Sequence, residues 1–356
     1  MKKVLSIVYC ALFFAACLFF FAGAVLTPPD TAAEGRELAP FPSWAAETGG
    51  VNLRFFTELD AYFSDRFTLR QTLISLSSRV RESVFRTGSD QVIVGRDGML
   101  FYAATVPDYT GGARMTDSEI AAAATALAGL SDYAAAHGAR FLVAVAPNKN
   151  TVYPDRMPAV YRRTAEATNL DALLAALTAA GVDAVDLRPV LRGQDVPVYH
   201  TRDTHWNGEG ARLAYDAMLT AAGIPHDSYS SAPLVFTEDF PGDLDEMLYP
   251  GSGRLSDDCT PDVSFADTFI YTSAFATAMD LSITTRGAGK GRLLMFRDSF
   301  GSRLIPYFSS AFAEARYERA VPYRIDLLET YAADLVIVEI AERNIPDLIS
   351  AADRLH

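Results

Sequence analysis

Cysteine and histidine are scarce in this chain of 356 residues, which has three of the former and five of the latter. Cys10 and Cys17 lie in an apolar segment near the N-terminus, so Cys259 is the only cysteine in the rest of the chain. No disulfide can form within that part, and an apolar core must stabilise it instead. Paired cysteines and the His-Glu-x-x-His motif are also missing, so we expect no cofactor and no metal.

Positive charge is the second shortage. The chain has 31 Lys and Arg residues against 44 Asp and Glu residues, which gives a formal net charge of −13 at pH 7. Binding to a phosphate backbone requires clustered Lys and Arg, so the composition argues against a nucleic-acid partner. Half of the residues are hydrophobic, which is enough for one large domain.

Charge is absent altogether from Val4 to Leu26, a run that follows Lys2 and Lys3. Such a run is long enough to cross a bilayer with its positive end inside. We therefore expect a transmembrane helix within residues 1–26 that anchors the chain in the cell membrane, with the remainder outside the cytoplasm. Small residues at 22–24 resemble a signal-peptidase site, and cleavage there would give a secreted protein. The anchor is favoured because the run exceeds the roughly 7–15 apolar residues of a signal peptide.

The next segments differ in composition. Residues 27–50 are rich in Pro, Ala and Glu, which predicts a linker without regular hydrogen bonding. Residues 51–86 place apolar side chains at helical spacing with charges between them, which predicts one long or two shorter amphipathic helices. We expect their apolar stripe to face the core; contact with a membrane partner is the alternative. Residues 51–356 are then one domain with an N-terminal helical extension.

Beyond residue 90 the pattern alternates between strands and helices. An Asp-Gly pair predicts a β-hairpin over residues 91–102. Apolar runs predict strands, and helical periodicity predicts helices, over these ranges: strands 141–146, 182–187, 293–296, 314–318 and 335–340; helices 117–137, 166–180 and 208–222. This order implies an α/β fold with a parallel sheet covered by helices on both faces. Residues 225–291 are expected to be an irregular insertion that ends in a plain Gly-rich turn.

Two motifs far apart in the sequence supply the parts of a nucleophilic site. Asp203 and His205 lie in an Asp-Thr-His-Trp motif, and Ser299 follows a predicted buried strand, at the sheet edge where ligands bind in such folds. In an extended segment, side chains two residues apart share a face. A serine hydroxyl needs an imidazole to take its proton, and the imidazole needs a carboxylate to orient it. We predict Ser299 as nucleophile, His205 as base and Asp203 as orienting acid.

Plainer interpretations remain open. An Asp-Ser pair at a helix start is often only an N-cap. His200 is a rival base, but it stands five residues from His205 and would point to the other face of an extended segment. A metal site formed by His200, Asp203 and His205 is another alternative, although no further metal-binding motif accompanies it.

Further residues are candidates for binding the substrate or the oxyanion. The backbone N–H of Ser299 is one expected oxyanion donor, and Asn148 or Lys149, which follow a buried strand, could supply the second. Either could instead close a turn. Trp206 could stack on a sugar ring, or it could wedge the loop of the Asp-Thr-His-Trp motif into the core.

Several motifs together resemble the SGNH-hydrolase-like alginate O-acetyltransferase proteins, and more closely their DHHW branch. These motifs are Gly-Arg-Asp-Gly-Met-Leu-Phe at 95–101, Pro-Asn-Lys at 147–149, Thr-Arg-Asp-Thr-His-Trp at 201–206 and Arg-Asp-Ser-Phe at 297–300. Asp-Arg-Phe at 65–67 with Arg70, and Glu-Arg-Asn at 342–344, are similar to that branch as well. The resemblance spans roughly residues 50 to 350.

The resemblance implies an extracytoplasmic enzyme that transfers acetyl groups to a polysaccharide through Ser299, His205 and Asp203. It also implies a partner, a multi-span membrane O-acyltransferase that supplies the acetyl group. This chain departs from the family pattern at Arg297, where a glycine is usual, and Arg297 could narrow the approach to Ser299 or bind an acidic glycan. Two alternatives remain: a carbohydrate acetylesterase with the same triad, and a non-catalytic envelope scaffold that recruits an acyltransferase.

Overall fold

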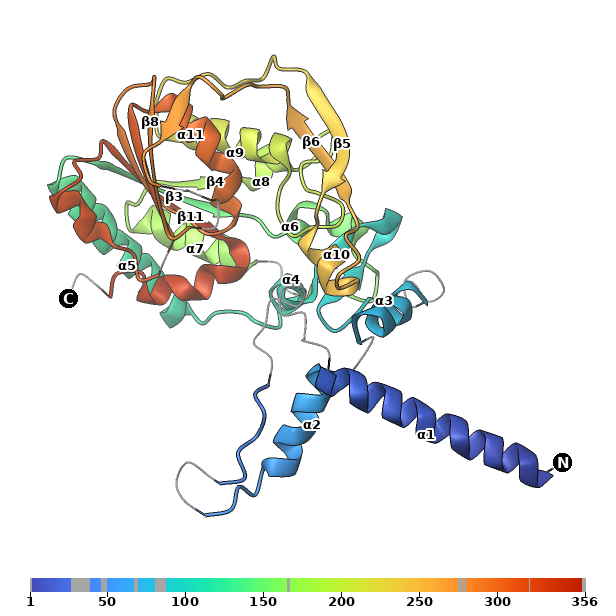
Figure 1. The fold of residues 1–356 in the computed structure, drawn as a ribbon. Helices are drawn as coiled ribbons and strands as arrows, with labels where there is room; N and C mark the ends of the chain where they lie inside the picture. Colours follow the sequence, from blue (N-terminus) through green and yellow to red (C-terminus); the bar gives the residue numbers. More distant parts are fainter. Residues whose placement is uncertain are drawn as a thin grey trace. The chain divides into compact units, whose positions relative to one another are not determined.

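The computed structural model describes residues 2–26, 39–45, 50–66, 70–80, 88–164, 167–274, 277, 280–319 and 321–353. The chain divides into two compact units (Figure 1). The N-terminal unit comprises Met1–Ser89 and Asp245–Arg254, and the sheet unit comprises Asp90–Leu244 and Leu255–His356.

A seven-stranded sheet forms the centre of the sheet unit, with the strand order β4-β3-β11-β9-β10-β8-β7. The strands from β4 to β10 are parallel, and β8 and β7 extend the sheet as antiparallel strands. Their bounds are β3 Arg140–Ala146, β4 Ala184–Asp186, β7 Phe269–Tyr271, β8 Ser282–Gly287, β9 Arg292–Phe296, β10 Glu314–Glu318 and β11 Leu335–Ala341. The predicted parallel sheet is confirmed, with an antiparallel edge that the sequence did not predict.

Helices cover both faces of this sheet (Figure 1). Helices α5 (Asp117–Ala136) and α7 (Asn169–Ala179) pack on one face, and α9 (Gly208–Ala221) and α11 (Ile305–Ala311) pack on the other. Side chains along each strand alternate between the two resulting cores, as the pleat requires. The β9 strand, for example, sends Leu294 to the α5 side. The doubly covered sheet explains why its central strands are apolar without interruption.

The helices begin where the sequence provides capping residues. Thr116 and Glu119 form a capping box at the start of α5, and Thr168 and Asp171 form another at the start of α7. Asn207 caps α9 by accepting a hydrogen bond from Gly210 N–H. Shorter helices complete the sheet unit: α4 Val106–Thr110, α6 Lys149–Val152 and α8 Arg188–Leu191, with the 3₁₀ helices η2 Arg96–Gly98, η3 Ala103–Thr105, η4 Pro154–Arg156, η5 Phe300–Leu304, η6 Ile325–Glu329 and η7 Glu342–Ser350.

The predicted hairpin is confirmed as β1 (Val92–Val94) paired with β2 (Leu100–Tyr102). Asp97 adopts a left-handed conformation in its turn, with φ of 53°, which Asp tolerates better than most residues. Gly95 is required for packing, because a Cβ there would collide with the Phe101 ring.

The expectation of an irregular insertion at residues 225–291 is wrong. Within it, β5 (Leu234–Phe240) pairs antiparallel with β6 (Ser256–Pro261), and α10 (Asp243–Leu248) lies between them in sequence. β7 and β8 also fall in this range. β6 and β8 were missed because they are rich in polar residues, Ser, Thr and Asp in β6 and Ser and Thr in β8, so they lack the apolar run that marks a buried strand.

The N-terminal unit contains α1 (Lys2–Leu26), α2 (Phe55–Asp65) and α3 (Arg70–Val80). Two shorter helices after residue 51 were one of the predicted outcomes. A search of the described residues finds no helix with the length and hydropathy needed to cross a membrane. Most of the predicted linker, residues 27–38 and 46–49, lies outside the described residues.

The apolar stripe of α2 is not buried within the N-terminal unit. No side chain of α2 is buried, and Phe56 is 74% exposed. Its aromatic rings instead contact the segment of residues 39–45, with 5.2 Å between the ring centroids of Phe41 and Tyr62 and 4.7 Å between those of Trp44 and Phe55. Phe67, the last residue of the predicted stripe, lies outside the described residues.

Two buried carboxylates lie at the carboxyl end of the sheet, at β11 and just after it. Glu342 accepts a hydrogen bond from Asn148 N–H at 2.7 Å, which ties the exit of β3 to the exit of β11. Glu339 accepts one from Asp298 N–H at 3.2 Å. Burial raises the pKa of Glu342 to about 7, although hydrogen bonds from Thr151 and Asn148 oppose the rise. Burial and the charge of Asp298 raise the pKa of Glu339 well above its ordinary value.

Leu294→Ala should destabilise the sheet unit by about 2–5 kcal/mol, because it removes buried methyl groups and leaves a cavity between β9 and the α5 side of the core. Urea unfolding followed by circular dichroism measures the change. Leu281→Ala is the control, because Leu281 is 69% exposed, and it should change the free energy of unfolding by less than about 0.5 kcal/mol. Equal effects of the two substitutions would contradict the assigned core.

Glu342→Gln should remove a pH dependence of stability. Folded Glu342 keeps its proton up to a pKa of about 7, whereas the unfolded chain releases it near the ordinary value of 4.5. Between these values the unfolded state binds fewer protons, so wild-type stability falls as pH rises, by at most about 1.4 kcal/mol per pH unit. Unfolding of both proteins from pH 4.5 to 7.5 measures the difference. Exposed Glu238→Gln should keep the wild-type slope, and an unchanged slope in Glu342→Gln would refute this assignment.

Candidate active site

Asp203, His205 and Ser299 meet at the carboxyl edge of the sheet. His205 Nδ1 lies 2.8 Å from Asp203 Oδ1, and His205 Nε2 lies 2.8 Å from Ser299 Oγ. Asp203 and His205 come from the loop before α9, and Ser299 follows β9 at the start of η5. The two segments lie 94 residues apart in sequence. The structure therefore brings together the three residues that the motifs singled out.

The loop that carries Asp203 and His205 is a closed turn and not the extended segment that was expected. An antiparallel bridge between Tyr199 and Trp206 closes it. Within it, Asp203 Oδ1 accepts hydrogen bonds from both His205 N–H, at 2.7 Å, and His205 Nδ1. This side-chain turn across two residues is a local preference of aspartate. It fixes the carboxylate and the imidazole as one unit.

The hydrogen bonds define the protonation state of the site. Ionised Asp203 can only accept, so His205 Nδ1 carries the proton and its neutral Nε2 is left to accept the Ser299 hydroxyl proton. Burial alone would raise the pKa of Asp203, but the hydrogen bonds and charge of His205 and a hydrogen bond from the Asp243 backbone lower it well below its ordinary value. Asp203 therefore stays ionised at neutral pH, as an orienting acid must.

Ser299 is not an N-cap through its side chain, since no capping hydrogen bond is made by it at η5. The neighbouring Asp298 has the structural role. Asp298 Oδ1 accepts from Phe300 N–H at 2.9 Å, and its Oδ2 accepts from Ala341 N–H at 2.7 Å and from Asn344 Nδ2 at 3.1 Å. Asp298 thus fastens the turn after β9 to the end of β11, and the Ser299 hydroxyl remains available to His205.

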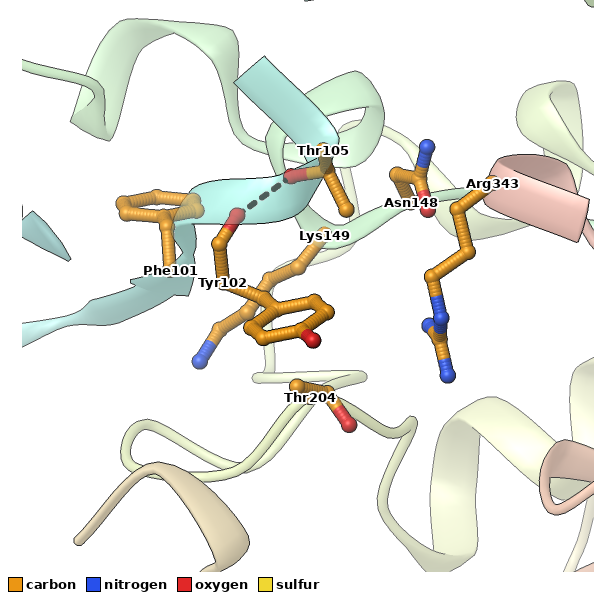
Figure 2. A pocket seen from close by; sticks show the side chains of 7 residues that line it. All are labelled: Phe101, Tyr102, Thr105, Asn148, Lys149, Thr204 and Arg343. Atoms are coloured by element: carbon orange, nitrogen blue, oxygen red, sulfur yellow. Dashed lines mark hydrogen bonds between the residues drawn. The ribbon is translucent and has the colours of Figure 1, made fainter. Parts of the chain in front are cut away.

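A small hollow is lined in part by Thr204, the residue between Asp203 and His205 (Figure 2). Its lining is Phe101, Tyr102, Thr105, Asn148, Lys149, Thr204 and Arg343. Thr204 precedes His205, and the Arg343 guanidinium lies 5.3 Å from the ring centroid of Phe300, the residue after Ser299. The hollow is therefore lined by, or in contact with, the sequence neighbours of His205 and Ser299.

The side chain of Asn148 is a buried amide at the hollow. Its side chain is 2% exposed and lines the hollow, and neither its amide nitrogen nor its amide oxygen has a hydrogen-bond partner among the described residues. A buried amide without a partner is costly, because it has lost water without replacement. The backbone N–H of Asn148 is fixed by its hydrogen bond to Glu342.

Lys149 is hydrogen-bonded to the loop that carries Asp203 and His205. Its Nζ donates to the carbonyls of Thr201, at 2.8 Å, and Asp203, at 3.0 Å. Figure 2 shows its side chain extending away from Arg343. Burial lowers the pKa of Lys149 to about 7, and the charge of Asp203 limits the fall. The side chain is therefore a positioning group beneath the loop.

Trp206 and Arg297 do not have the substrate-binding roles considered for them. Trp206 is fully buried, donates from Nε1 to the Phe300 carbonyl at 3.1 Å and packs edge-on against the Phe300 ring. It wedges the loop into the core and has no free face for a sugar. Arg297 is 3% exposed and donates to the carbonyls of Asp298 and Asp280, so its guanidinium group points into the protein interior.

A metal set of His200, Asp203 and His205 is not assembled. His200 is buried, with Nδ1 2.7 Å from the Asp257 carbonyl and its ring stacked on Phe240. In the described part of the chain, the group of three His, Cys, Asp or Glu residues whose ligand atoms all lie within 4.8 Å of one another is Asp203, His205 and Asp243. Both imidazole nitrogens of His205 are already hydrogen-bonded, to Asp203 and Ser299.

Sequence reasoning missed Asp243 and the pocket residues Tyr102 and Arg343 as parts of the site. Arg343 stands in the Glu-Arg-Asn motif at 342–344, directly after a predicted strand, and that position at the carboxyl edge could have identified it. Tyr102 ends the predicted hairpin. Asp243 lies in the stretch expected to be irregular and carries no local signal.

The chain is similar in sequence to proteins described as acetyltransferases or acetylases. The family described as "SGNH hydrolase-like domain, acetyltransferase AlgX" matches residues 92–261, a range that includes Asp203 and His205 and ends before Ser299. A protein of Pseudomonas syringae pv. tomato named probable alginate O-acetylase AlgJ is 23% identical over 257 residues, which cover 70% of this chain and 61% of that protein. The chain thus spans about three fifths of this relative.

Two solved structures share the fold. A DHHW family protein from Eubacterium siraeum has a TM-score of 0.55 at 17% identity, with 73% of this chain and 95% of that chain covered. PatB1 from Bacillus cereus has a TM-score of 0.55 at 16% identity, with 71% and 96% covered. The chain is thus similar in sequence to this SGNH-hydrolase-like family and to AlgJ, and it shares its fold with the DHHW family protein and PatB1.

Proposed function

We propose that this chain is an O-acetyltransferase that carries an acetyl group on Ser299 and transfers it to a hydroxyl of an exported or cell-envelope polysaccharide. The observation that carries the proposal is the pair of 2.8 Å contacts that His205 makes with Asp203 and with Ser299. The matches to acetyltransferase proteins support acyl transfer as the reaction class.

The first half-reaction acylates the serine. Ser299 Oγ attacks the carbonyl carbon of the acetyl donor as His205 Nε2 takes the hydroxyl proton, and a tetrahedral oxyanion forms. The imidazolium returns that proton to the leaving group when the bond between the carbonyl carbon and the donor breaks. Ionised Asp203, 2.8 Å from Nδ1, stabilises the imidazolium between the two steps.

Asn148 and the Ser299 backbone N–H stabilise the oxyanion in this proposal. The buried Asn148 amide has lost its solvent and found no protein partner, so a developing negative charge in the hollow gains a hydrogen bond that the resting state lacks. Such an interaction is made only in the transition state and therefore raises kcat more than it lowers KM.

The second half-reaction distinguishes the proposal from its nearest alternative. A glycan hydroxyl loses its proton to His205 Nε2 and attacks the acyl-serine carbonyl, after which Ser299 leaves and recovers the proton. Water in the same position would give acetate, and the protein would be a carbohydrate acetylesterase. The half-buried Tyr102 ring and the Arg343 guanidinium line the hollow from which the acceptor approaches. A non-catalytic scaffold would not require an ionised Asp203 that is hydrogen-bonded to His205, or a His205 that is hydrogen-bonded to Ser299.

The proposal also places the sheet unit outside the cytoplasm, anchored by the uncharged run from Val4 to Leu26 or secreted after its cleavage. A multi-span O-acyltransferase in the membrane delivers the acetyl group. Both parts rest on the sequence and on the resemblance to alginate O-acetyltransferases. Fractionation of cells that express the whole chain tests the location, and recovery in the cytosol contradicts it.

Ser299→Ala and His205→Ala should each lower the rate of acetyl release from an activated acetyl ester by at least about 10³-fold, because nucleophile and base act as a unit. Absorbance of the released nitrophenol from p-nitrophenyl acetate measures the rate. Exposed Ser230→Ala should keep wild-type activity. Full activity in Ser299→Ala, with the fold intact, would contradict Ser299 as the nucleophile.

Asn148→Ala should lower kcat by about 10²–10³-fold and leave KM nearly unchanged, because it removes a donor to the oxyanion. Asn148→Asp should be equally slow, since it keeps the size of the side chain and loses the N–H groups. Gln194→Ala removes an exposed amide and serves as the control. Steady-state kinetics with the same ester checks the effect, and a loss confined to KM would contradict the assigned role.

Incubation of the whole protein with the ester and with oligosaccharides should yield acetylated sugar, detected by mass spectrometry. Ester-bearing sugar that needs Ser299 supports transfer. Release of acetate alone, with every oligosaccharide left unmodified, would overturn transfer in favour of the esterase.

A further inference from the structure

A second carboxylate reaches the triad from the segment between β5 and β6. Asp243 Oδ1 accepts a hydrogen bond from Thr204 N–H at 2.8 Å, and its Oδ2 accepts one from the Thr204 hydroxyl at 2.5 Å. The same Oδ2 lies 3.7 Å from His205 Nδ1, beyond hydrogen-bonding distance but close enough for its charge to act on the ring. Nothing in the triad motifs points to this residue.

Asp243 also fixes the position of Asp203, the orienting acid of the proposed triad. Its backbone N–H donates to Asp203 Oδ2 at 2.8 Å, while Asp203 Oδ1 is bound to His205. Each oxygen of the Asp203 carboxylate is therefore fixed, one by the base and one by Asp243. A carboxylate held at both oxygens cannot rotate away from the imidazole, and loss of orientation at this position is costly in triads.

The chain before Asp243 is shaped to make this contact. A Cβ at Gly242 would collide with the carbonyl of Arg202, the residue before Asp203. Only glycine lets this segment approach the catalytic loop so closely. Asp257 holds the start of the same loop, where it accepts from Thr201 N–H at 2.9 Å.

We propose that Asp243 is a positioning residue of the active site: it locks Asp203 and Thr204 so that His205 keeps its orientation, and its charge stabilises the imidazolium. The inference rests on the proposed function, because it assigns a role within that triad. Thr204 Oγ1 lies 3.1 Å from His205 Nδ1 and donates to Asp243, so Thr204 links Asp243 to the ring. The charged groups that act on Asp243 are Asp203, His205 and the Lys149 ammonium below the loop.

Asp243→Asn tests the role of the charge, because the amide keeps the size of the side chain and the backbone bond to Asp203. We expect kcat for p-nitrophenyl acetate to fall by about 10-fold with KM unchanged. We also expect the downfield proton resonance of His205 Nδ1–H to shift, because a negative charge 3.7 Å away has gone. Exposed Asp239→Asn, in the same segment, should change neither.

Gly242→Ala tests the approach of the segment with Asp243 left chemically intact. The added methyl must push the segment away from the Arg202 carbonyl, so kcat should fall and the His205 resonance should shift as well. Gly112→Ala is the control, since a Cβ there meets its nearest atom at 3.6 Å.

The outcomes separate this inference from the proposed function. An inactive wild-type protein contradicts the proposed function. A wild-type protein that is active, with Asp243→Asn equal to it in kcat and in the His205 resonance, overturns only the inference about Asp243. A fall in kcat with an unchanged resonance and a lowered unfolding midpoint also overturns it, because that result describes a purely structural residue.

Discussion

The two hydrogen bonds of the His205 imidazole join parts of the chain that are otherwise separate. One ring nitrogen is hydrogen-bonded to Asp203 in the loop before α9, and the other is hydrogen-bonded to Ser299 in the turn after β9. Both contacts need the same ring orientation at once, so the two segments must be held within a few tenths of an ångström. Asp298 fastens the serine turn to β11, and Trp206 and Lys149 fasten the loop to its surroundings.

This precision is achieved with buried ionisable groups, which cost stability. Lys149, Glu339 and Glu342 are all nearly inaccessible, and burial shifts the pKa of each toward its neutral form. None of the three is required for the apolar core, which lies on the two faces of the sheet. All three lie at the carboxyl edge of the sheet, around Asp203, His205 and Ser299. A loss of stability is tolerated at such a position when the buried groups hold other side chains in a fixed geometry.

The fold could be predicted where the sequence signal is local. Apolar runs identified β3, β9 and β11, and capping residues identified α5. The polar strands β6 and β8 could not be found this way, because their stability comes from pairing and from contacts distant in sequence. The triad was recognisable since its chemistry restricts the residue types. Asp243 was not, because an aspartate acquires that role only when the fold places it beside Thr204.

The most direct test of the central claim is the position of the acetyl group during turnover. Wild-type protein mixed with an activated acetyl ester, quenched in acid within milliseconds and digested, should give an acetylated peptide that contains Ser299, with the acetyl group located on that serine by tandem mass spectrometry. Turnover with an unmodified Ser299, or with the acetyl group on another residue, would contradict the account.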